Sequence, residues 1–408
     1  MKKIDEFLPL ISLIVIIACV NLNFNIAICI YCAIITFFYI FKEKFTIKKC
    51  NILIYVFALY SLVVSFIGLI DTLNFNFRIV ELYKLFIKIC IIIICFISVP
   101  KEKENIKKSI MHLRDFGIVL ALLGIIEFIM KRNIYYNITR VEFKDWQILN
   151  FGTQKYRLVS IFLHPIVYSV FLNFFYWCLK IFPYKKEYLN YIFKILLIFN
   201  LLFTQSRSGI IAFVLSIIVY DYLKIKNNEK VKKKNILNFL IIFVVTVSII
   251  AIFRNVFYDI YAFLEARYFQ NIKSDYSYLQ RTGAIINIIN YSLDNIFFLV
   301  FGRGYGYSSI FMKETPVFAG FYVVDNQYFT YFQEIGLIGV FIFLIIIIKS
   351  IIKGLKSKKR ELEVFSYFLM TLLISIFFFE GMCWLTVVAI TFLSVAFLNS
   401  YVHEDITK

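Results

Sequence analysis

Apolar segments separated by short polar connections run along the whole chain. A membrane-crossing helix needs about 20 apolar residues, and most segments approach this length, although several are shorter. No segment alternates with a period of two, as barrel strands do. The pattern predicts an all-α, polytopic integral membrane protein with about 12 transmembrane helices, which we treat as a single membrane domain over residues 1–408. The segments are Leu8–Asn23, Ile26–Phe41, Asn51–Ile70, Leu82–Val99, Phe116–Met130, Ser160–Ile181, Leu189–Thr204, Gly209–Tyr222, Ile236–Phe253, Tyr328–Ile348, Phe365–Phe379 and Cys383–Asn399.

Composition supports the membrane assignment. Of 408 residues, 61% are hydrophobic and 17% are charged, whereas a soluble domain has about 25% charged residues. These values exclude a soluble enzyme, a disordered protein and a nucleic-acid-binding domain. The net charge of +18 is instead explained by the excess of Lys and Arg that membrane proteins carry on their cytoplasmic side.

The basic connections define an orientation. If the N-terminus is cytoplasmic, every short basic connection falls on the same side, as the positive-inside rule requires. Twelve spans then place both termini in the cytoplasm, and we expect a multi-pass protein of the bacterial cell membrane. The basic connections are Lys42–Cys50, Pro100–Asp115, Pro183–Glu187, Lys224–Asn235 and Lys349–Glu363.

Two connections on the opposite, outer side are long. One is Lys131–Leu158, and the other is Arg254–Gln327, which precedes the tenth span. A loop of this second length is expected to be functional or partly folded. Apolar residues recur at helical spacing in Tyr278–Leu299, so we expect one or two helices at the outer membrane surface. A thirteenth span is the alternative, but it would place the basic connection Lys349–Arg360 outside.

Charged residues beside the apolar segments are the candidates for chemistry, because charge is costly in lipid and tends to be functional. Arg207 lies in the tight outer connection Gln205-Ser-Arg-Ser-Gly209. Its polar neighbours favour a binding pocket over the alternative role of a surface anchor. Arg157 precedes the next candidate, His164, which we expect about two turns inside a span, next to Pro165.

The long outer loop supplies two further clusters. Arg281 opens its amphipathic segment, and three glycines follow at Gly302, Gly304 and Gly306. Glycine allows close backbone approach, and exposed amides there can cradle an anion. The second cluster joins the loop to the tenth span.

That second cluster contains Asp325, Asn326 and Glu334. Asp325 stands where it can act in catalysis or cap the helix, while Glu334 falls about two turns later and points into the bundle or marks a later start of the span. No metal-ligand spacing, nucleotide-binding motif or paired-carboxylate motif is visible, so we expect neither a metal nor a cofactor.

In order and spacing, these clusters resemble the O-antigen ligase/polymerase (Wzy-like) family of polytopic membrane glycosyltransferases. The resemblance covers roughly residues 115 to 345. It rests on Arg-x-x-x-x-Phe-x-His-Pro at Arg157–Pro165, Gln-Ser-Arg-Ser-Gly at Gln205–Gly209, Arg281 followed by the glycines, and Asp-Asn-x-Tyr…Glu-x-Gly-Leu-x-Gly at Asp325–Gly339. The ligase branch usually has His-Asn where this chain has Asp325-Asn326, which favours a repeat-unit polymerase.

The resemblance implies a function and a division of labour among these residues. The substrate would be oligosaccharide carried by undecaprenyl pyrophosphate at the outer face, polymerised into capsule, exopolysaccharide or O-antigen by inverting glycosyl transfer. The residues implied to bind pyrophosphate or sugar are Arg157, Arg207, Arg281, Gly302, Gly304, Gly306, Asn326 and Glu334. Arg207 would also stabilise the departing charge, and Asp325 or His164 would accept the proton of the attacking hydroxyl.

Other functions remain open from the sequence. An O-antigen ligase would share the fold but use a different acceptor. A flippase of lipid-linked oligosaccharide belongs to another class, and it would place its cations in a central cavity instead of at the outer face. Expected partners are the lipid-linked oligosaccharide, membrane lipids, a chain-length regulator and a flippase, and not nucleic acid.

Overall fold

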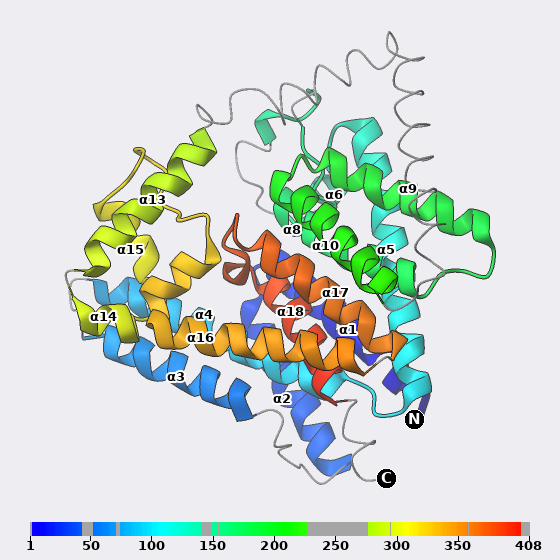
Figure 1. Cartoon of the computed structure of the whole chain (residues 1–408), viewed down its shortest axis with the longest axis horizontal. Helices are drawn as coiled ribbons and strands as arrows, with labels where there is room; N and C mark the ends of the chain where they lie inside the picture. Colours follow the sequence, from blue (N-terminus) through cyan, green and yellow to red (C-terminus); the bar gives the residue numbers. More distant parts are fainter. Residues whose placement is uncertain are drawn as a thin grey trace.

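The computed structural model describes residues 2–42, 52–70, 74–139, 148–153, 156–226, 276–293, 295–357 and 359–400. Within them the chain is helical and forms no sheet (Figure 1). The helices are α1 (Lys2–Asn21), α2 (Asn25–Lys42), α3 (Ile52–Gly68), α4 (Phe75–Ser98), α5 (Lys103–Met130), α6 (Ile134–Thr139), α8 (Pro165–Ile181), α9 (Glu187–Phe203), α10 (Arg207–Lys226), α13 (Tyr276–Leu293), α14 (Ile296–Phe301), α15 (Tyr307–Glu314), α16 (Gln327–Lys356), α17 (Arg360–Ser375), the 3-10 helix η4 (Gly381–Cys383) and α18 (Leu385–Ser400).

The helical architecture confirms the all-α prediction. Eleven of the twelve apolar segments overlap a helix, and the twelfth, Ile236–Phe253, lies outside the described residues. Among those residues, α16 is long and apolar enough to cross a membrane. Four further apolar helices are shorter, namely Asn25–Ile40, Ile52–Gly68, Pro165–Ile181 and Leu385–Asn399. The number of spans stays a prediction.

Helices α8, α17 and α18 form the interior of the bundle. Nearly every residue of α8 is buried, as expected for a helix that is apolar on all sides. α8 packs against α17 and α5, and α18 packs against α4 and α17. A polar contact joins two of these helices, since the indole of Trp177 on α8 donates to the Thr371 hydroxyl on α17 at 3.0 Å. The bundle is therefore a rigid support for the loops at its ends.

One end of the bundle collects the basic connections. Arg114 on α5 donates to the carbonyl of Phe182 at 2.8 Å. Arg360 on α17 donates to the carbonyl of Ile181 at 2.6 Å. Helices α13, α14 and α15 gather at the other end, on the left in Figure 1. The connections around Arg114, Phe182 and Arg360 thus lie together, and the orientation of the chain in a membrane stays a prediction.

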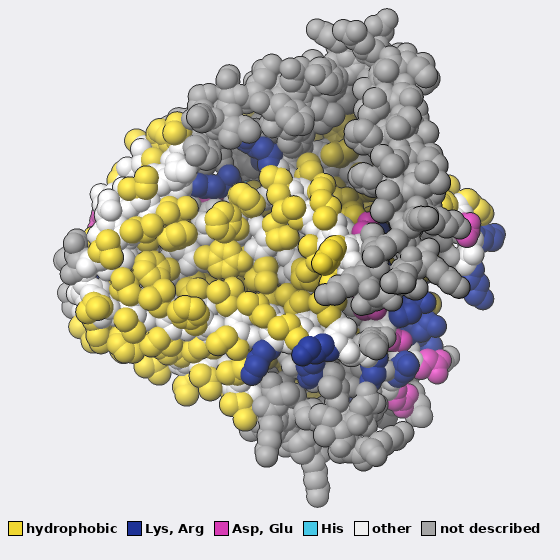
Figure 2. Space-filling view, in the orientation of Figure 1, with side chains coloured by type: hydrophobic (Ala, Val, Ile, Leu, Met, Phe, Trp, Pro, Cys, Tyr) yellow, Lys and Arg dark blue, Asp and Glu magenta, His cyan; other side chains and the backbone are white. Residues whose placement is uncertain are grey.

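The face shown in Figure 2 carries a broad hydrophobic surface, bordered below by Lys and Arg side chains. Large apolar side chains stand exposed on α3 and α16, with Leu59 64%, Phe66 57% and Phe341 58% exposed. Apolar surface on this scale marks contact with a partner or a membrane.

The start of α8 and the presence of α15 differ from the sequence prediction. α8 begins at Pro165 and not at Ser160, because proline favours the first helical position and disfavours helix in the residue before it. His164 therefore precedes the helix instead of lying two turns inside it. The outer loop contains α13 and α14 in the predicted amphipathic segment, together with the unpredicted α15.

Candidate active site

Arg157 ties the loop before α8 to the turn between α9 and α10. Its Nε donates to the carbonyl of Thr204 at 2.9 Å, and an Nη donates to the carbonyl of Gln205 at 3.3 Å. The amide of Leu158 donates to the carbonyl of Phe203 at 3.0 Å. These bonds bring Arg157 alongside the turn that carries Arg207, although 50 residues separate them in sequence.

Arg207 is the first residue of α10 and is partly exposed. The turn before it is strained, since Gln205 has a φ of 52°, which non-glycine residues rarely adopt. The hydroxyl of Ser206 lies 3.1 Å from that of Ser169 on α8, so the turn is fastened to the core. A cation at a helix N-terminus, where amide dipoles also point outward, is suited to an anionic ligand.

Glu127 holds the backbone of the loop that follows Arg157, although no motif in the sequence pointed to it. This carboxylate on α5 is 1% exposed. It accepts hydrogen bonds from the Tyr156 hydroxyl at 2.6 Å, the Val159 amide at 3.0 Å and the Ser160 amide at 2.7 Å. The available signal was a carboxylate inside the apolar segment Phe116–Met130, which is unusual enough to mark a specific partner.

His164 caps α8. Its Nδ1 accepts the amide of Ile166 at 3.2 Å, and its ring centre lies 4.9 Å from that of Trp384. Because Nδ1 is an acceptor here, the neutral ring carries its proton on Nε2. This hydrogen bond makes His164 the N-cap of α8, and its role as a proton acceptor stays a prediction.

Arg281 and Asp325 form an ion pair between α13 and the start of α16. An Nη of Arg281 lies 3.4 Å from Oδ2 of Asp325, and the two side chains are 26% and 23% exposed. Within the part of the chain that the structure describes, the buried Nε of Arg281 has no hydrogen-bond partner. The pair is therefore open to solvent and retains an unused donor.

Asn326, and not Asp325, caps α16. Its side-chain oxygen accepts the amides of Tyr328 at 3.0 Å and Phe329 at 3.3 Å. Asp325 stands one residue earlier with a φ of 56°, a strained conformation of the kind found at functional sites. The sequence allowed Asp325 to act as the helix cap or in catalysis. In the structure Asn326 is the cap, so the Asp325 carboxylate is not needed for capping.

Glu380, between α17 and η4, holds the backbone of this turn and was also missed. Its Oε1 accepts the amides of Val324 at 2.7 Å and Asp325 at 3.2 Å, and the hydroxyl of Thr330 at 3.1 Å. Burial, and then the nearby Asp325 carboxylate, raise the pKa of the Glu380 carboxyl. In the sequence, Glu380 could have been noticed as a lone carboxylate between two apolar segments.

The three glycines of the outer loop form a packing joint. The amides of Gly304 and Gly306 donate to the Glu334 carbonyl at 2.8 Å and to its Oε1 at 2.9 Å. The amide of Gly302 donates to the Phe298 carbonyl at 2.8 Å. Since these amides already have protein acceptors, the geometry does not support the interpretation of the glycines as an anion cradle. Glu334 is buried and also accepts the Ser308 hydroxyl, so it braces this turn.

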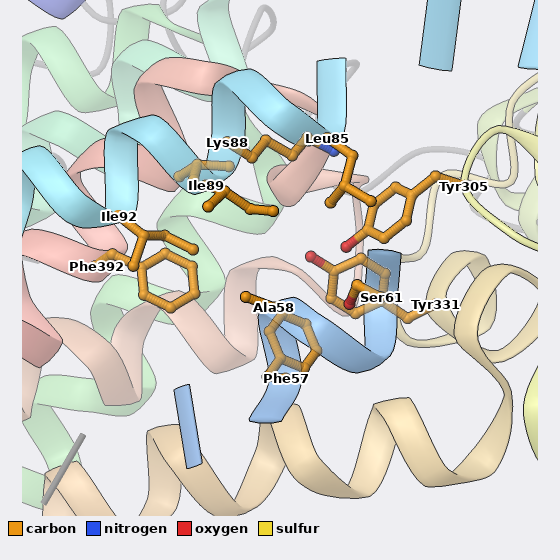
Figure 3. Close-up of a pocket in the computed structure, with 11 residues that line it drawn as sticks. Phe57, Ala58, Ser61, Leu85, Lys88, Ile89, Ile92, Tyr305, Tyr331 and Phe392 are labelled. Atoms are coloured by element: carbon orange, nitrogen blue, oxygen red, sulfur yellow. The ribbon is translucent and has the colours of Figure 1, made fainter. Parts of the chain in front are cut away.

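A small cavity lies under the glycine turn. Figure 3 shows the hydroxyls of Tyr305, Tyr331 and Ser61 turned toward one another, with Lys88 above them. The Nζ of Lys88 lies 4.7 Å from the centre of the Tyr305 ring. The cavity measures about 20 Å³, which is enough for about one water molecule. It is too small for a sugar, so it is not the active site.

The structure thus brings the predicted residues into two groups. Arg157 and Arg207 lie together at the α9–α10 turn, while Arg281 and Asp325 lie together at the start of α16. Trp384, which follows η4, has its ring centre 4.9 Å from that of His164. Each group offers guanidinium groups suited to phosphate, and the second also has a carboxylate.

Comparison with known proteins agrees with this picture. No curated protein matches the chain. Residues 192–344 match a family model described as O-antigen ligase. The matched stretch contains Arg207, Arg281, the glycines, Asp325 and Glu334. Over these residues the chain is similar to the O-antigen ligase family, which confirms the resemblance that its motifs indicated.

Proposed function

We propose that the protein is a membrane glycosyltransferase that polymerises undecaprenyl-pyrophosphate-linked oligosaccharide repeat units. The match to the O-antigen ligase family supports glycosyl transfer in polysaccharide synthesis. The observation that carries the proposal is the pair of Arg281 and Asp325 at the entrance of α16. Arg281 would bind the leaving pyrophosphate, and Asp325 would accept the proton of the attacking hydroxyl. The two side chains lie 3.4 Å apart.

In the proposed reaction, a hydroxyl group of the acceptor sugar displaces the lipid pyrophosphate from the donor sugar. The acceptor hydroxyl oxygen attacks the anomeric carbon of the donor sugar, and the bond from that carbon to the pyrophosphate oxygen breaks. The hydroxyl proton moves to Asp325, and the lipid pyrophosphate leaves with the electron pair. Displacement in one step inverts the anomeric centre. Arginines stabilise the departing charge, because the guanidinium group binds phosphate oxygens in a bidentate way.

Arg281 links the two halves of this reaction. In the structure its guanidinium is paired with Asp325 at 3.4 Å. A pyrophosphate that binds Arg281 would compete with Asp325 for this guanidinium. Donor binding would therefore weaken the ion pair and leave the Asp325 carboxylate to meet the acceptor hydroxyl.

The orientation follows from the charges. We propose that the end with α13, α14 and α15 faces outward, that residues 254–327 form an extracytoplasmic loop, and that both termini are cytoplasmic in the bacterial cell membrane. The basic connections at the opposite end support this. The terminal residues 401–408 and part of the loop, residues 254–275, lie outside the described residues. A flippase and a chain-length regulator are proposed as partners.

Asp325 favours a polymerase over a ligase. The ligase branch usually has histidine at this position, and an imidazole would not form the ion pair with Arg281 that is present here. A flippase is less compatible with the site, because its cations would line a central cavity. Arg281 instead lies on α13 and Arg207 at the start of α10, and both side chains are partly exposed.

Sizing the surface polysaccharide in a strain without this gene separates these functions. Loss of a polymerase leaves single repeat units, whereas loss of a flippase leaves none translocated and loss of a ligase leaves full-length polymer unattached. Complementation with the wild type should restore the polymer, and Asp325→Asn should not. Arg132→Gln is a matched control, since Arg132 is exposed after α5. Full-length unattached polymer in the deletion strain would contradict the proposal.

A further inference from the structure

We propose that the loop between α15 and α16 contacts sugar rings of the acceptor through an aromatic tip, formed by Phe321 and Tyr322. The inference rests on the proposed function and deepens it, since it names the side chains that would select the saccharide to be extended. The loop covers residues 315–326 and contains Asp325, the proton acceptor of the proposed reaction. In Figure 1 it is the yellow connection that leaves α15 and passes beside α13.

The base of the loop is fixed to the helix that carries Arg281. The side-chain nitrogen of Gln280 on α13 donates to the carbonyl of Val323 at 2.9 Å. On the other side of the loop, Val317 packs on α13 so closely that a Cβ atom added to Gly283 would lie 2.7 Å from its side chain. These two contacts lie on either side of Arg281 in the sequence of α13. The loop therefore has a defined position next to that residue.

The tip of the loop follows a tight turn and presents exposed aromatic side chains. The amide of Phe321 donates to the carbonyl of Phe318 at 3.2 Å. Within this turn Gly320 has a φ of 83°, and nothing lies within 4 Å of the position that an added Cβ would occupy. Phe321 is 37% and Tyr322 is 41% exposed. Two exposed aromatic residues in succession on a fixed loop indicate a surface for a ligand.

The tip lies within reach of the reacting groups. Tyr322 is three residues before Asp325, so their Cα atoms are at most about 11 Å apart, given about 3.6 Å per extended residue. The segment between them is held, because Oε1 of Glu380 accepts the amides of Val324 at 2.7 Å and Asp325 at 3.2 Å. A sugar whose hydroxyl meets Asp325 would therefore place its neighbouring rings beside the tip.

Charges on both sides of the tip favour a saccharide over membrane lipid as the ligand. Lys313 and Glu314 are exposed on the side of α15. The partly exposed pair of Arg281 and Asp325 lies on the other side. Charged groups are costly in hydrocarbon, so we expect a tip flanked in this way to face water.

A sugar ring in water suits this tip chemically. The C–H groups on one face of a pyranose lie against an aromatic ring, which is a large apolar surface with an electron-rich face. The sugar hydroxyls stay hydrated, and the Tyr322 hydroxyl can donate to or accept from one of them. The inferred ligand is therefore a pyranose with C–H groups along one face.

Saturation-transfer difference NMR of the full chain in detergent tests the inference. The probe is the repeat-unit oligosaccharide released from the surface polysaccharide of the same strain by partial depolymerisation. The wild type should transfer saturation to ring C–H protons of the probe. Phe321→Ala and Tyr322→Ala should each raise the Kd about tenfold or more, the usual effect of removing an apolar contact of this size. Phe297→Ala is the matched control, since Phe297 on α14 is 52% exposed, and it should bind like the wild type.

Phe321→Leu distinguishes a sugar contact from insertion of the tip into the membrane. Leucine keeps the apolar character but has no aromatic face, so this variant should bind the probe as weakly as Phe321→Ala, whereas Phe321→Trp should keep binding. Wild-type affinity in Phe321→Leu would overturn the inference in favour of a membrane contact. Wild-type affinity in both alanine variants would overturn it altogether.

An extension assay separates this inference from the proposed function. The alanine variants should raise the KM for the acceptor about tenfold and leave kcat close to that of the wild type, because the tip binds the sugar without touching the reacting atoms. A protein that binds the probe through Phe321 but extends no chains would keep the aromatic tip and lose the polymerase assignment.

Discussion

Gly302 and Gly336 meet backbone to backbone. A Cβ atom on Gly302 would lie 2.5 Å from the amide nitrogen of Gly336, and one on Gly336 would lie 2.6 Å from that of Gly302. α16 is interrupted at this point, since Gly336 has a φ of 64° and a ψ of −176°. The turn before α15 therefore packs directly against the kink of α16. The contact between Gly302 and Gly336 leaves no room for a side chain on either residue.

Gly302→Ala should lower the stability of the protein. The residue has a φ of 83°, and an added Cβ would also overlap the carbonyl oxygen of Glu334 at 2.5 Å. We expect a loss of about 2–4 kcal/mol in the free energy of unfolding, from backbone strain and overlap together. Thermal unfolding of the purified protein in detergent measures it.

Gly320→Ala separates the effect of backbone strain from the effect of steric overlap. Gly320 has the same φ of 83°, but nothing lies within 4 Å of the position that an added Cβ would occupy. Its substitution should cost only the strain, about 1–2 kcal/mol. Equal losses at the two positions would show that the contact between Gly302 and Gly336 contributes nothing to stability.

Asp325→Asn should abolish chain extension while the protein folds normally. The substitution removes the proton acceptor but leaves the α16 cap, which Asn326 supplies. Losing a general base reduces the rate by about 10²–10⁴-fold. Asn326→Ala should show the reverse pattern, with about 1 kcal/mol lost in stability. In vitro extension of lipid-linked repeat units and thermal unfolding measure both effects, and wild-type activity in Asp325→Asn would exclude Asp325 as the base.

Arg207→Ala should reduce polymer synthesis by about 10²–10³-fold, the usual cost of removing a group that stabilises transition-state charge. Arg207→Lys should recover only part of the activity, because an ammonium group cannot make bidentate phosphate contacts. Membrane insertion and yield should stay at wild-type values. If Arg207→Ala extends chains at the normal rate, the side chain is only a surface anchor.

Glu380→Gln should change how stability depends on pH. Because the pKa of Glu380 is raised in the folded protein, its protonated form is favoured there. That stabilisation is complete below the ordinary glutamate pKa of about 4.3 and is lost as the pH rises through the folded pKa. The unfolding temperature of the wild type minus that of Glu380→Gln should therefore fall as the pH rises from the ordinary glutamate pKa through the higher pKa of the folded protein.

Asp325→Asn provides the control for this pH dependence. The Asp325 carboxylate is the second cause of the raised pKa of Glu380, so its removal should shrink the difference between wild type and Glu380→Gln. An unfolding temperature difference that instead grows with pH would contradict the assignment of a raised pKa.

Periodicity and hydropathy predicted eleven segments that overlap helices of the described structure, but they missed α15. They could not distinguish Asp325 from Asn326 as the cap, because both residue types favour the position and only the backbone dihedrals separate them. They placed His164 inside a helix, because the apolar run continues through it. Pro165 carried the necessary information, since its ring sets the first turn of α8.

The braces of the site were harder to predict. Glu127 and Glu380 lie far in sequence from the loops that they hold, and each acts through backbone amides, which leave no mark on the sequence of the loop itself. The hydrogen bonds from the amides of Gly304 and Gly306 to Glu334 could not be predicted either, because backbone amides carry no sequence signal. A lone carboxylate between apolar segments is a usable signal, but its partner becomes known only from the fold.

The position of Glu127 also affects which segments must be exchanged together to transfer the site between related proteins. Glu127 belongs to α5 and holds the Arg157 loop, and both precede the stretch 192–344 that matches the family. Glu380 follows that stretch and holds the Asp325 turn. A chimera that exchanges only residues 192–344 between relatives would carry Arg207, Arg281 and Asp325. It would leave behind Glu380, which holds the Asp325 turn, and Arg157 with its support Glu127. Exchange of substrate preference should therefore require residues from Glu127 to Glu380 to move as one piece.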